Sequence, residues 1–322
     1  MGFGRIDVHH HFTTDFYAEA VAEAGGDPSG FKGVPDWSLE LDKDFNDKNE
    51  ISTSILSLTA PGACIVKSRE GRAKLARRCN EYLAKLRDDA PQRYGFFATL
   101  PCMTDADDFL SEVAYALDTL KADGLTLFTR YGSGHQYLGH PEFTKIWDEL
   151  DRRKAVIFIH PTHPVDTVLV NPMMTQPVVQ YPFETTITAV DMLVNKVPQN
   201  HPNCKIILSH AGGTLPFLFT RPASAFEPGS EEHQAFVDAV RNFYFDTALS
   251  GSDTVLRFMQ DFAKPGHLLC GSDFPYAGPQ HIRHHLPNLA KFKFEREELR
   301  EEIYYKNALE LFPRLAKYYT KN

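Results

Sequence analysis

The chain has 322 residues, of which 43% are hydrophobic and 24% charged, so it is long and apolar enough to bury a sizeable core. Its formal net charge is -8, and its Lys and Arg residues are scattered, which argues against nucleic acid or an anionic membrane as a partner. Five cysteines without a Cys-x-x-Cys pair, no apolar stretch of about 20 residues and no signal-peptide pattern predict a reducing, cytoplasmic location.

Short apolar segments alternate with helical patterns along the chain. Several of these segments are continuously apolar, as in strands that are buried on both faces of a parallel sheet. Eight strands are predicted, at Arg5–His9, Ile51–Leu58, Tyr94–Leu100, Gly124–Phe128, Ala155–His160, Lys205–His210, Phe243–Ala248 and His267–Ser272. Helices are predicted at Glu70–Arg87, Ala106–Leu120, Glu142–Arg153, Thr185–Val194, Glu231–Asn242 and Arg296–Leu311. The alternation predicts an α/β fold, a (β/α)8 TIM barrel, and without a linker we expect residues 1–322 to form one domain.

Two long segments interrupt this pattern. Residues 13–50, between the first two strands, are rich in Gly, Pro and Asp, and Pro161–Pro182 follows the fifth strand. The loops that follow the strands of such a barrel build its active-site face. We therefore interpret residues 13–50 as an irregular lid or insertion, and both segments as candidates for substrate contact.

Polar residues stand where predicted strands end, and a barrel brings such strand ends together around one mouth. His9 and His11 close the first strand, and because strand side chains alternate, they face the same side whereas His10 faces the other. His160 closes the fifth strand and Asp273 the eighth. Three imidazole nitrogens and one carboxylate oxygen suit zinc and permit other divalent ions. A His-x-His pair alone is a weak signal, so the predicted metal site depends on all four positions.

Longer motifs around these residues point to a known family. Asp7–His11 has the form Asp-x-His-x-His, Ser209–Gly213 reads Ser-His-Ala-Gly-Gly, and Gly271–Pro275 reads Gly-Ser-Asp-Phe-Pro. Over nearly the whole chain the sequence resembles the amidohydrolase superfamily, in the branch typified by aminocarboxymuconate-semialdehyde decarboxylase. Leu58–Gly62 together with Tyr181–Thr186 is most similar to the 6-methylsalicylate decarboxylase group within that branch.

The resemblance carries roles to this sequence one residue at a time. It implies that the metal ligands are His9, His11, His160 and Asp273. His210 matches a histidine that acts as acid or base, or orients a metal-bound water. Arg221 matches an arginine that reaches into a neighbouring subunit to hold a substrate carboxylate, which implies a homodimer or homotetramer; the alternative is a surface salt bridge. Gly124–Thr129 lacks the lysine that binuclear members use on the fourth strand, so one ion is expected, zinc in the first place or manganese.

Aromatic residues flank the loops that are expected to receive the substrate. Trp37, Phe183 and Phe274, and beside them Phe12 and Tyr276, are candidates to stack on a substrate ring. Packing within the core or the lid is the alternative for each of them.

The resemblance implies a metal-dependent, non-oxidative decarboxylase, a carboxy-lyase that acts on a small aromatic acid of the salicylate type, such as 6-methylsalicylate. We predict that Asp273 delivers a proton to the ring carbon with His210 beside it, and the alternative assigns His210 to activate a metal-bound water. The same ligands would serve a metal-dependent hydrolase or hydratase of a lactone, amide or ester, which is the alternative function. A non-enzymatic metal-binding or sensor protein is a third interpretation, but it explains poorly why these residues converge on one barrel mouth.

Overall fold

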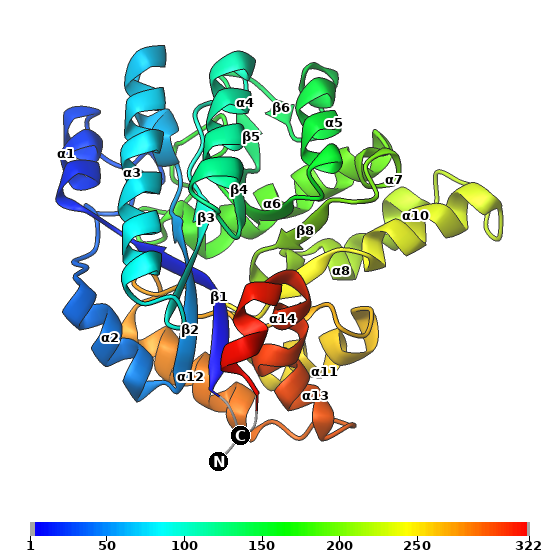
Figure 1. Ribbon diagram of the computed structural model, residues 1–322. Helices are drawn as coiled ribbons and strands as arrows, with labels where there is room; N and C mark the ends of the chain where they lie inside the picture. Colours follow the sequence, from blue (N-terminus) through cyan, green and yellow to red (C-terminus); the bar gives the residue numbers. More distant parts are fainter. Residues whose placement is uncertain (1–3, 321–322) are drawn as a thin grey trace.

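The computed structural model describes residues 4–320, in which eight parallel strands form the centre of the molecule in chain order (Figure 1). The strands are β1 (Arg5–Phe12), β2 (Ile51–Leu58), β3 (Tyr94–Ala98), β4 (Gly124–Phe128), β7 (Val156–His160), β8 (Lys205–Leu208), β9 (Tyr244–Asp246) and β10 (Leu268–Leu269). The sheet closes where the Asp273 amide donates to the His9 carbonyl at 2.8 Å and where Phe274 pairs with His10. The predicted (β/α)8 barrel is therefore confirmed.

Helices surround the strands, and Figure 1 shows α3, α4 and α5 side by side on the outside of the barrel. The helices are α1 (Asp15–Glu23), α2 (Leu39–Lys48), α3 (Arg69–Asp89), α4 (Ala106–Ala114), α5 (Thr144–Arg152), α6 (Gln176–Val194), α7 (Val197–Asn200), α8 (Leu215–Leu218), α9 (Thr220–Ala223), α10 (Glu231–Arg241), α11 (Asp253–Phe262), α12 (Pro279–Lys291), α13 (Glu298–Glu301) and α14 (Asn307–Leu311). A short hairpin, β5 (Arg130–Tyr131) with β6 (Gln136–Tyr137), follows β4. No helix in residues 4–320 combines the length and hydropathy that a membrane crossing requires.

The segment 13–50 is more regular than we expected, because it contains α1 and α2. Tyr17 and Val21, one turn apart on α1, are both buried. Ser38 caps α2, since its side chain accepts from the Leu41 amide at 3.2 Å. The expectation of an irregular segment was wrong at these two helices, and it missed this capping residue.

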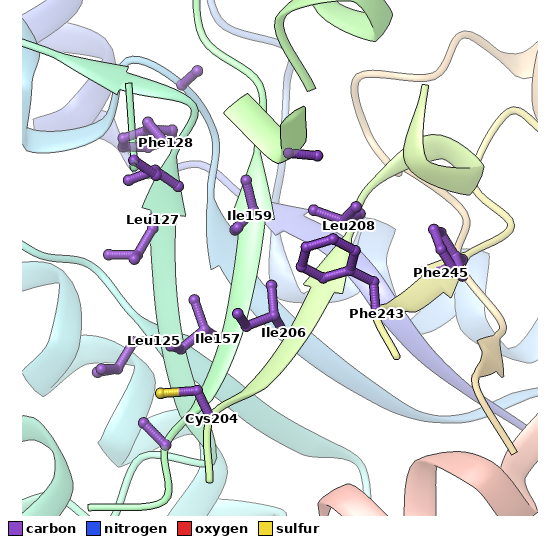
Figure 2. Packing of buried hydrophobic residues seen from close by; sticks show 14 of the residues in the cluster. Leu125, Leu127, Phe128, Ile157, Ile159, Cys204, Ile206, Leu208, Phe243 and Phe245 are labelled. Carbon is purple, nitrogen blue, oxygen red and sulfur yellow. The ribbon is translucent and has the colours of Figure 1, made fainter. Parts of the chain in front are cut away.

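Side chains of the central strands alternate between two buried layers. Figure 2 shows Ile157 and Ile159 of β7 near Leu208 of β8, in the layer between the strands and the helices. Phe158, between the two isoleucines, belongs to the separate layer inside the barrel. Each such buried side chain contributes about 1.5–3 kcal/mol to the free energy of unfolding. The same period of two turns His160 toward the barrel interior.

The C-terminal segment packs against the inner layer at the amino ends of the strands. Phe312 follows α14, and its ring centroid lies 5.8 Å from that of Phe97 on β3. Leu315 is fully buried in the same layer, and the Tyr319 hydroxyl lies 2.9 Å from Thr53 Oγ1 at the start of β2. With this end covered, the polar strand ends gather at the other end of the barrel.

Candidate metal centre

Four predicted residues from three strand ends come together at this open end. One ligand atom from each of His9, His11, His160 and Asp273 lies within 4.8 Å of the others. The two Nε2 atoms of His9 and His11 are 3.1 Å apart, and Asp273 Oδ1 lies 3.3 Å from the first and 3.2 Å from the second. Asp273 has a φ of 63°, an uncommon backbone conformation that often marks a functional position.

The three imidazole rings are oriented by bonds on their outer nitrogens. Nδ1 of His9 donates to Asp246 Oδ2 at 2.9 Å. Nδ1 of His11 donates to the Ser57 carbonyl at 3.1 Å, and Nδ1 of His160 donates to the Pro161 carbonyl at 2.7 Å. Each acceptor holds a ring proton on Nδ1, so the three Nε2 atoms face one another. Metal-binding histidines are held by this kind of outer hydrogen bond.

The pKa values of these residues reflect how closely their nitrogen and oxygen atoms are packed. Burial opposes protonation of His9, but the carboxylates of Asp246 and Asp273 outweigh it and raise the pKa of His9 to about 10. Burial lowers the pKa of His11 and His160. Burial alone would raise the pKa of Asp273, yet the histidines around it hold that pKa well below its usual range. In this group, three imidazole nitrogens and one carboxylate oxygen compete for a proton. The same four atoms would bind a single divalent cation in place of that proton.

His210 lies beside this group in a short 3-10 turn after β8, with a φ of 55°. Its ring centroid is 4.7 Å from that of His9. Its Nδ1 donates to the Ala248 carbonyl at 3.1 Å, and burial lowers its pKa. At neutral pH the Nε2 atom of His210 therefore carries a lone pair next to the centre, as a base or hydrogen-bond acceptor requires.

Asp246 is a candidate functional residue that our sequence reasoning did not select. It ends β9, is fully buried, and accepts the Nδ1 proton of His9 on Oδ2. Its Oδ1 accepts from the backbone amides of His210 at 3.1 Å and Ala248 at 2.9 Å. One carboxylate thus positions both a candidate metal ligand and the candidate base. Its place at a strand end, as for the selected residues, was a signal that could have identified it.

Two tyrosines border the centre, Tyr181 from the segment Pro161–Pro182 and Tyr276 from the loop that follows β10. Tyr276 meets the His11 ring edge-on, with ring centroids 5.5 Å apart. Tyr181, on α6, meets the His160 ring edge-on at 6.2 Å. Phe31, from the segment 13–50, lies 5.5 Å from the Tyr276 ring. The two long segments therefore both reach the open end of the barrel.

Trp37 and Phe274 lie on the other side of β1, with His10. His10 donates from Nδ1 to Asp7 Oδ2 and from Nε2 to Asp42 Oδ2, both at 2.9 Å, and the second bond joins α2 to the strand. Trp37 Nε1 donates to Asp42 at 3.3 Å, and Phe274 packs against His10 with ring centroids 5.2 Å apart. The structure does not bring these two aromatic rings to the candidate metal ligands.

Phe183 and Arg221 are exposed. The side chain of Phe183 is 50% exposed on the outer face of α6, whereas Tyr181 and Glu184 on the same helix are buried. Arg221 is exposed on α9. Within one chain, neither residue joins the group around the candidate metal ligands, and their roles in binding a substrate stay predictions.

Comparison with known proteins places this geometry in a family. Residues 6–314 match the amidohydrolase family. The chain is 49% identical over 315 residues to a 6-methylsalicylic acid decarboxylase of Penicillium expansum, covering 97% of each chain. It is 47% identical over 325 residues to a protein of the same name from Aspergillus aculeatus, again covering 97% of each.

Solved structures agree with this result. A structure described as an amidohydrolase II superposes with a TM-score of 0.87 at 30% identity, covering 96% of this chain and 99% of the other. A dihydroxybenzoic acid decarboxylase of Polaromonas, solved with manganese and the inhibitor 2-nitroresorcinol, superposes with a TM-score of 0.81 at 21% identity and 97% coverage of both chains. The resemblance inferred from the motifs is confirmed, and this chain belongs to the amidohydrolase family.

Proposed function

We propose that this chain is a metal-dependent decarboxylase that removes carbon dioxide from an aromatic acid of the salicylate type, such as 6-methylsalicylate. The observation that carries the proposal is the 49% identity, over 97% of both chains, to the 6-methylsalicylic acid decarboxylase of Penicillium expansum. The barrel alone would support it weakly, because one fold hosts many reactions. The converging His9, His11, His160 and Asp273 add the donor atoms that a metal-dependent reaction needs.

The proposed cofactor is one divalent ion, zinc in the first place and manganese as the alternative. The donor set of three imidazoles and one carboxylate suits either ion, and the related Polaromonas structure contains manganese. When bound, the ion would supply positive charge that orients the substrate carboxylate and its ortho oxygen and stabilises negative charge on the ring.

The proton that reaches the ring carbon must first be collected, because the two candidate acids are deprotonated at rest. The pKa of Asp273 lies well below its usual range, and that of His210 is lowered by burial. We propose that Asp273 takes the phenol proton of the substrate on Oδ2 and passes it to the ring carbon that bears the carboxylate. Carbon dioxide then leaves with the electron pair returned to the ring, and the phenolate product takes a proton from water. His210 lies beside this path as a positioning group.

We propose a homodimer, or a homotetramer built from it, in which a second copy covers the outer face of α6. This face exposes Val179 (40%), Phe183 (50%), Ile187 (44%) and Val194 (58%). The first three recur every four residues, so they form one apolar stripe. Apolar surface of this kind marks interaction sites. α6 packs on α8, and α8 packs on α9, so we propose that a second copy bound to this stripe would come close to Arg221 on α9. Light scattering should report a dimer or a larger assembly for the wild type and a monomer for Phe183→Glu. A wild-type monomer with full activity would rule out this assembly.

The five cysteines are unpaired in the structure, which supports the proposed reducing, cytoplasmic location.

A panel of substrates separates decarboxylation from hydrolysis by the same ligands. Metal-loaded enzyme should release carbon dioxide from 6-methylsalicylate and related 2-hydroxybenzoates, and should leave lactones, amides and esters intact. Hydrolysis of any of the latter without carbon dioxide release from the acids would replace the proposal with the hydrolase alternative.

A further inference from the structure

A side cavity of about 440 Å³ opens next to the candidate metal centre, and two cysteines line it. Cys64 lies in the 3-10 turn that follows β2, and Cys102 lies in the loop that follows β3. Phe128 also lines the cavity, and its ring centroid is 6.4 Å from that of His160. The cavity is therefore a neighbour of the metal centre, but its two thiols have no part in the proposed decarboxylation.

The sulfur of Cys102 is surrounded by hydrogen-bond donors. The Thr104 hydroxyl lies 3.0 Å from it and can donate, and the Cys64 thiol and the backbone amides of Thr104 and Gly132 favour its charged form. Four donors around one sulfur stabilise a thiolate, which accepts hydrogen bonds, over a thiol. The Cys64 bond and then the Thr104 and Gly132 bonds outweigh burial and lower the pKa of Cys102 to about 5.

Positive charge also faces this cavity from several elements. Lys67 and Arg72 line it from the β2 side, with Arg72 paired to Asp105 at 2.6 Å. Arg130 lines it from the β4 side and donates to the main-chain carbonyls of His163, Gly132, Gly134 and Pro164. His163 and Tyr131 complete its titratable lining. Reactive cysteines occur in electropositive, partly open surroundings of this kind.

We propose that Cys102 is a reactive thiolate and that it forms a reversible disulfide with Cys64 in the presence of a peroxide. The Cys102 thiolate attacks one peroxide oxygen, the O–O bond breaks, and hydroxide leaves, which oxidises the sulfur to a sulfenic acid. The Cys64 sulfur then attacks the Cys102 sulfur, the S–O bond breaks, and water leaves with the thiol proton. The two sulfurs supply the two electrons that reduce the peroxide, and a dithiol reductant reverses the reaction by exchange.

Alkylation kinetics test the thiolate. The metal-loaded enzyme is treated with iodoacetamide across the pH range, and modification of each cysteine is followed by peptide mass spectrometry. Cys102 should be half-maximally reactive near pH 5, the value that its pKa of about 5 sets, and Cys64→Ala should raise this midpoint by removing one donor. Cys204, whose pKa burial raises to about 12, is the control and should stay unmodified. A Cys102 midpoint near the ordinary thiol value of about 8.5 overturns the thiolate.

Peroxide treatment tests the disulfide. Hydrogen peroxide should yield a Cys64–Cys102 cross-linked peptide that disappears with dithiothreitol. In the Cys64→Ser variant, the same treatment should leave a Cys102 sulfenic acid that dimedone traps. Cys204→Ser is the matched control, and it should form the cross-link as the wild type does. Dimedone trapping in Cys64→Ser without a cross-link in the wild type overturns the pairing, and absence of both products overturns the whole proposal.

Discussion

The substitution Asp246→Asn isolates what the buried carboxylate does for the metal centre. If the amide oxygen accepts from His9 Nδ1, the amide nitrogen faces the backbone N–H groups of His210 and Ala248, which now donate to the carboxylate at 3.1 and 2.9 Å. If the amide turns around, its nitrogen donates to His9 Nδ1 and moves the ring proton to Nε2, where it blocks the metal. In the first orientation, backbone donors face the amide donor, and in the second, the His9 proton occupies the atom that would bind the metal.

An unmatched buried donor costs about 1–3 kcal/mol. Loss of an outer partner of a metal ligand typically weakens metal binding about 10- to 100-fold, or about 1.4–2.8 kcal/mol at 1.4 kcal/mol per tenfold. Competition with a chelator, read by metal analysis, measures this loss directly. Asp123→Asn is the matched control, because the Asp123 side chain is only 3% exposed and pairs with Arg314 at the amino end of β4, away from the candidate metal ligands. Metal affinity in Asp246→Asn equal to that of the control would refute the reasoning.

Three further changes test other parts of the account. Asp273→Asn should lower kcat by roughly 10²–10⁴-fold while the protein still folds, and near-normal turnover in a metal-loaded sample would remove Asp273 from proton transfer. Chelation should lower Tm, because an ion at about 100 times its Kd stabilises the fold by about 2.7 kcal/mol; calorimetry that shows one Tm with and without chelator would argue against a bound ion. Burial, and then Arg130, lower the pKa of His163 to about 4, so the folded state binds fewer protons than the unfolded state between that value and about 6.5. The free energy of unfolding should therefore decrease as the pH is lowered from about 6.5 to about 4, and it should decrease less in His163→Gln; the same change of Tm over this pH range in both proteins would contradict this.

Strand positions were predictable because apolar runs end at polar residues. The bounds predicted for Ile51–Leu58 and Gly124–Phe128 are those of β2 and β4. The expected orientation of His9 and His11, with His10 turned away, followed from the period of two along a strand. These features are local, so the sequence alone contains them.

Two of the helices that the sequence analysis missed, α11 and α12, differ in how clearly the sequence indicates them. Along α11, Leu256, Met259 and Phe262 are buried at helical spacing, a pattern that could have been recognised. α12 contains Pro287 and several histidines, which obscure the pattern of a buried face.

Contacts between distant segments could not be predicted. The place of Asp246 at a strand end was visible in the sequence, but its bonds to His9 on β1 and to the His210 amide after β8 join segments that are far apart along the chain. Cys102 is reactive in our proposal because of donors from Cys64 and Gly132, residues far from it along the chain. Trp37 was a reasonable candidate for a substrate ring, but its position was fixed by a bond to Asp42 on a helix that the sequence analysis did not identify.

Metal-dependent release of carbon dioxide from 6-methylsalicylate tests the central claim most directly. Metal-free enzyme is titrated with zinc and, separately, with manganese, and carbon dioxide and 3-methylphenol are measured at each step. The account predicts equal amounts of both products, with activity rising to a plateau at one ion per chain. No carbon dioxide at any metal level, or a plateau that requires two ions per chain, would contradict it.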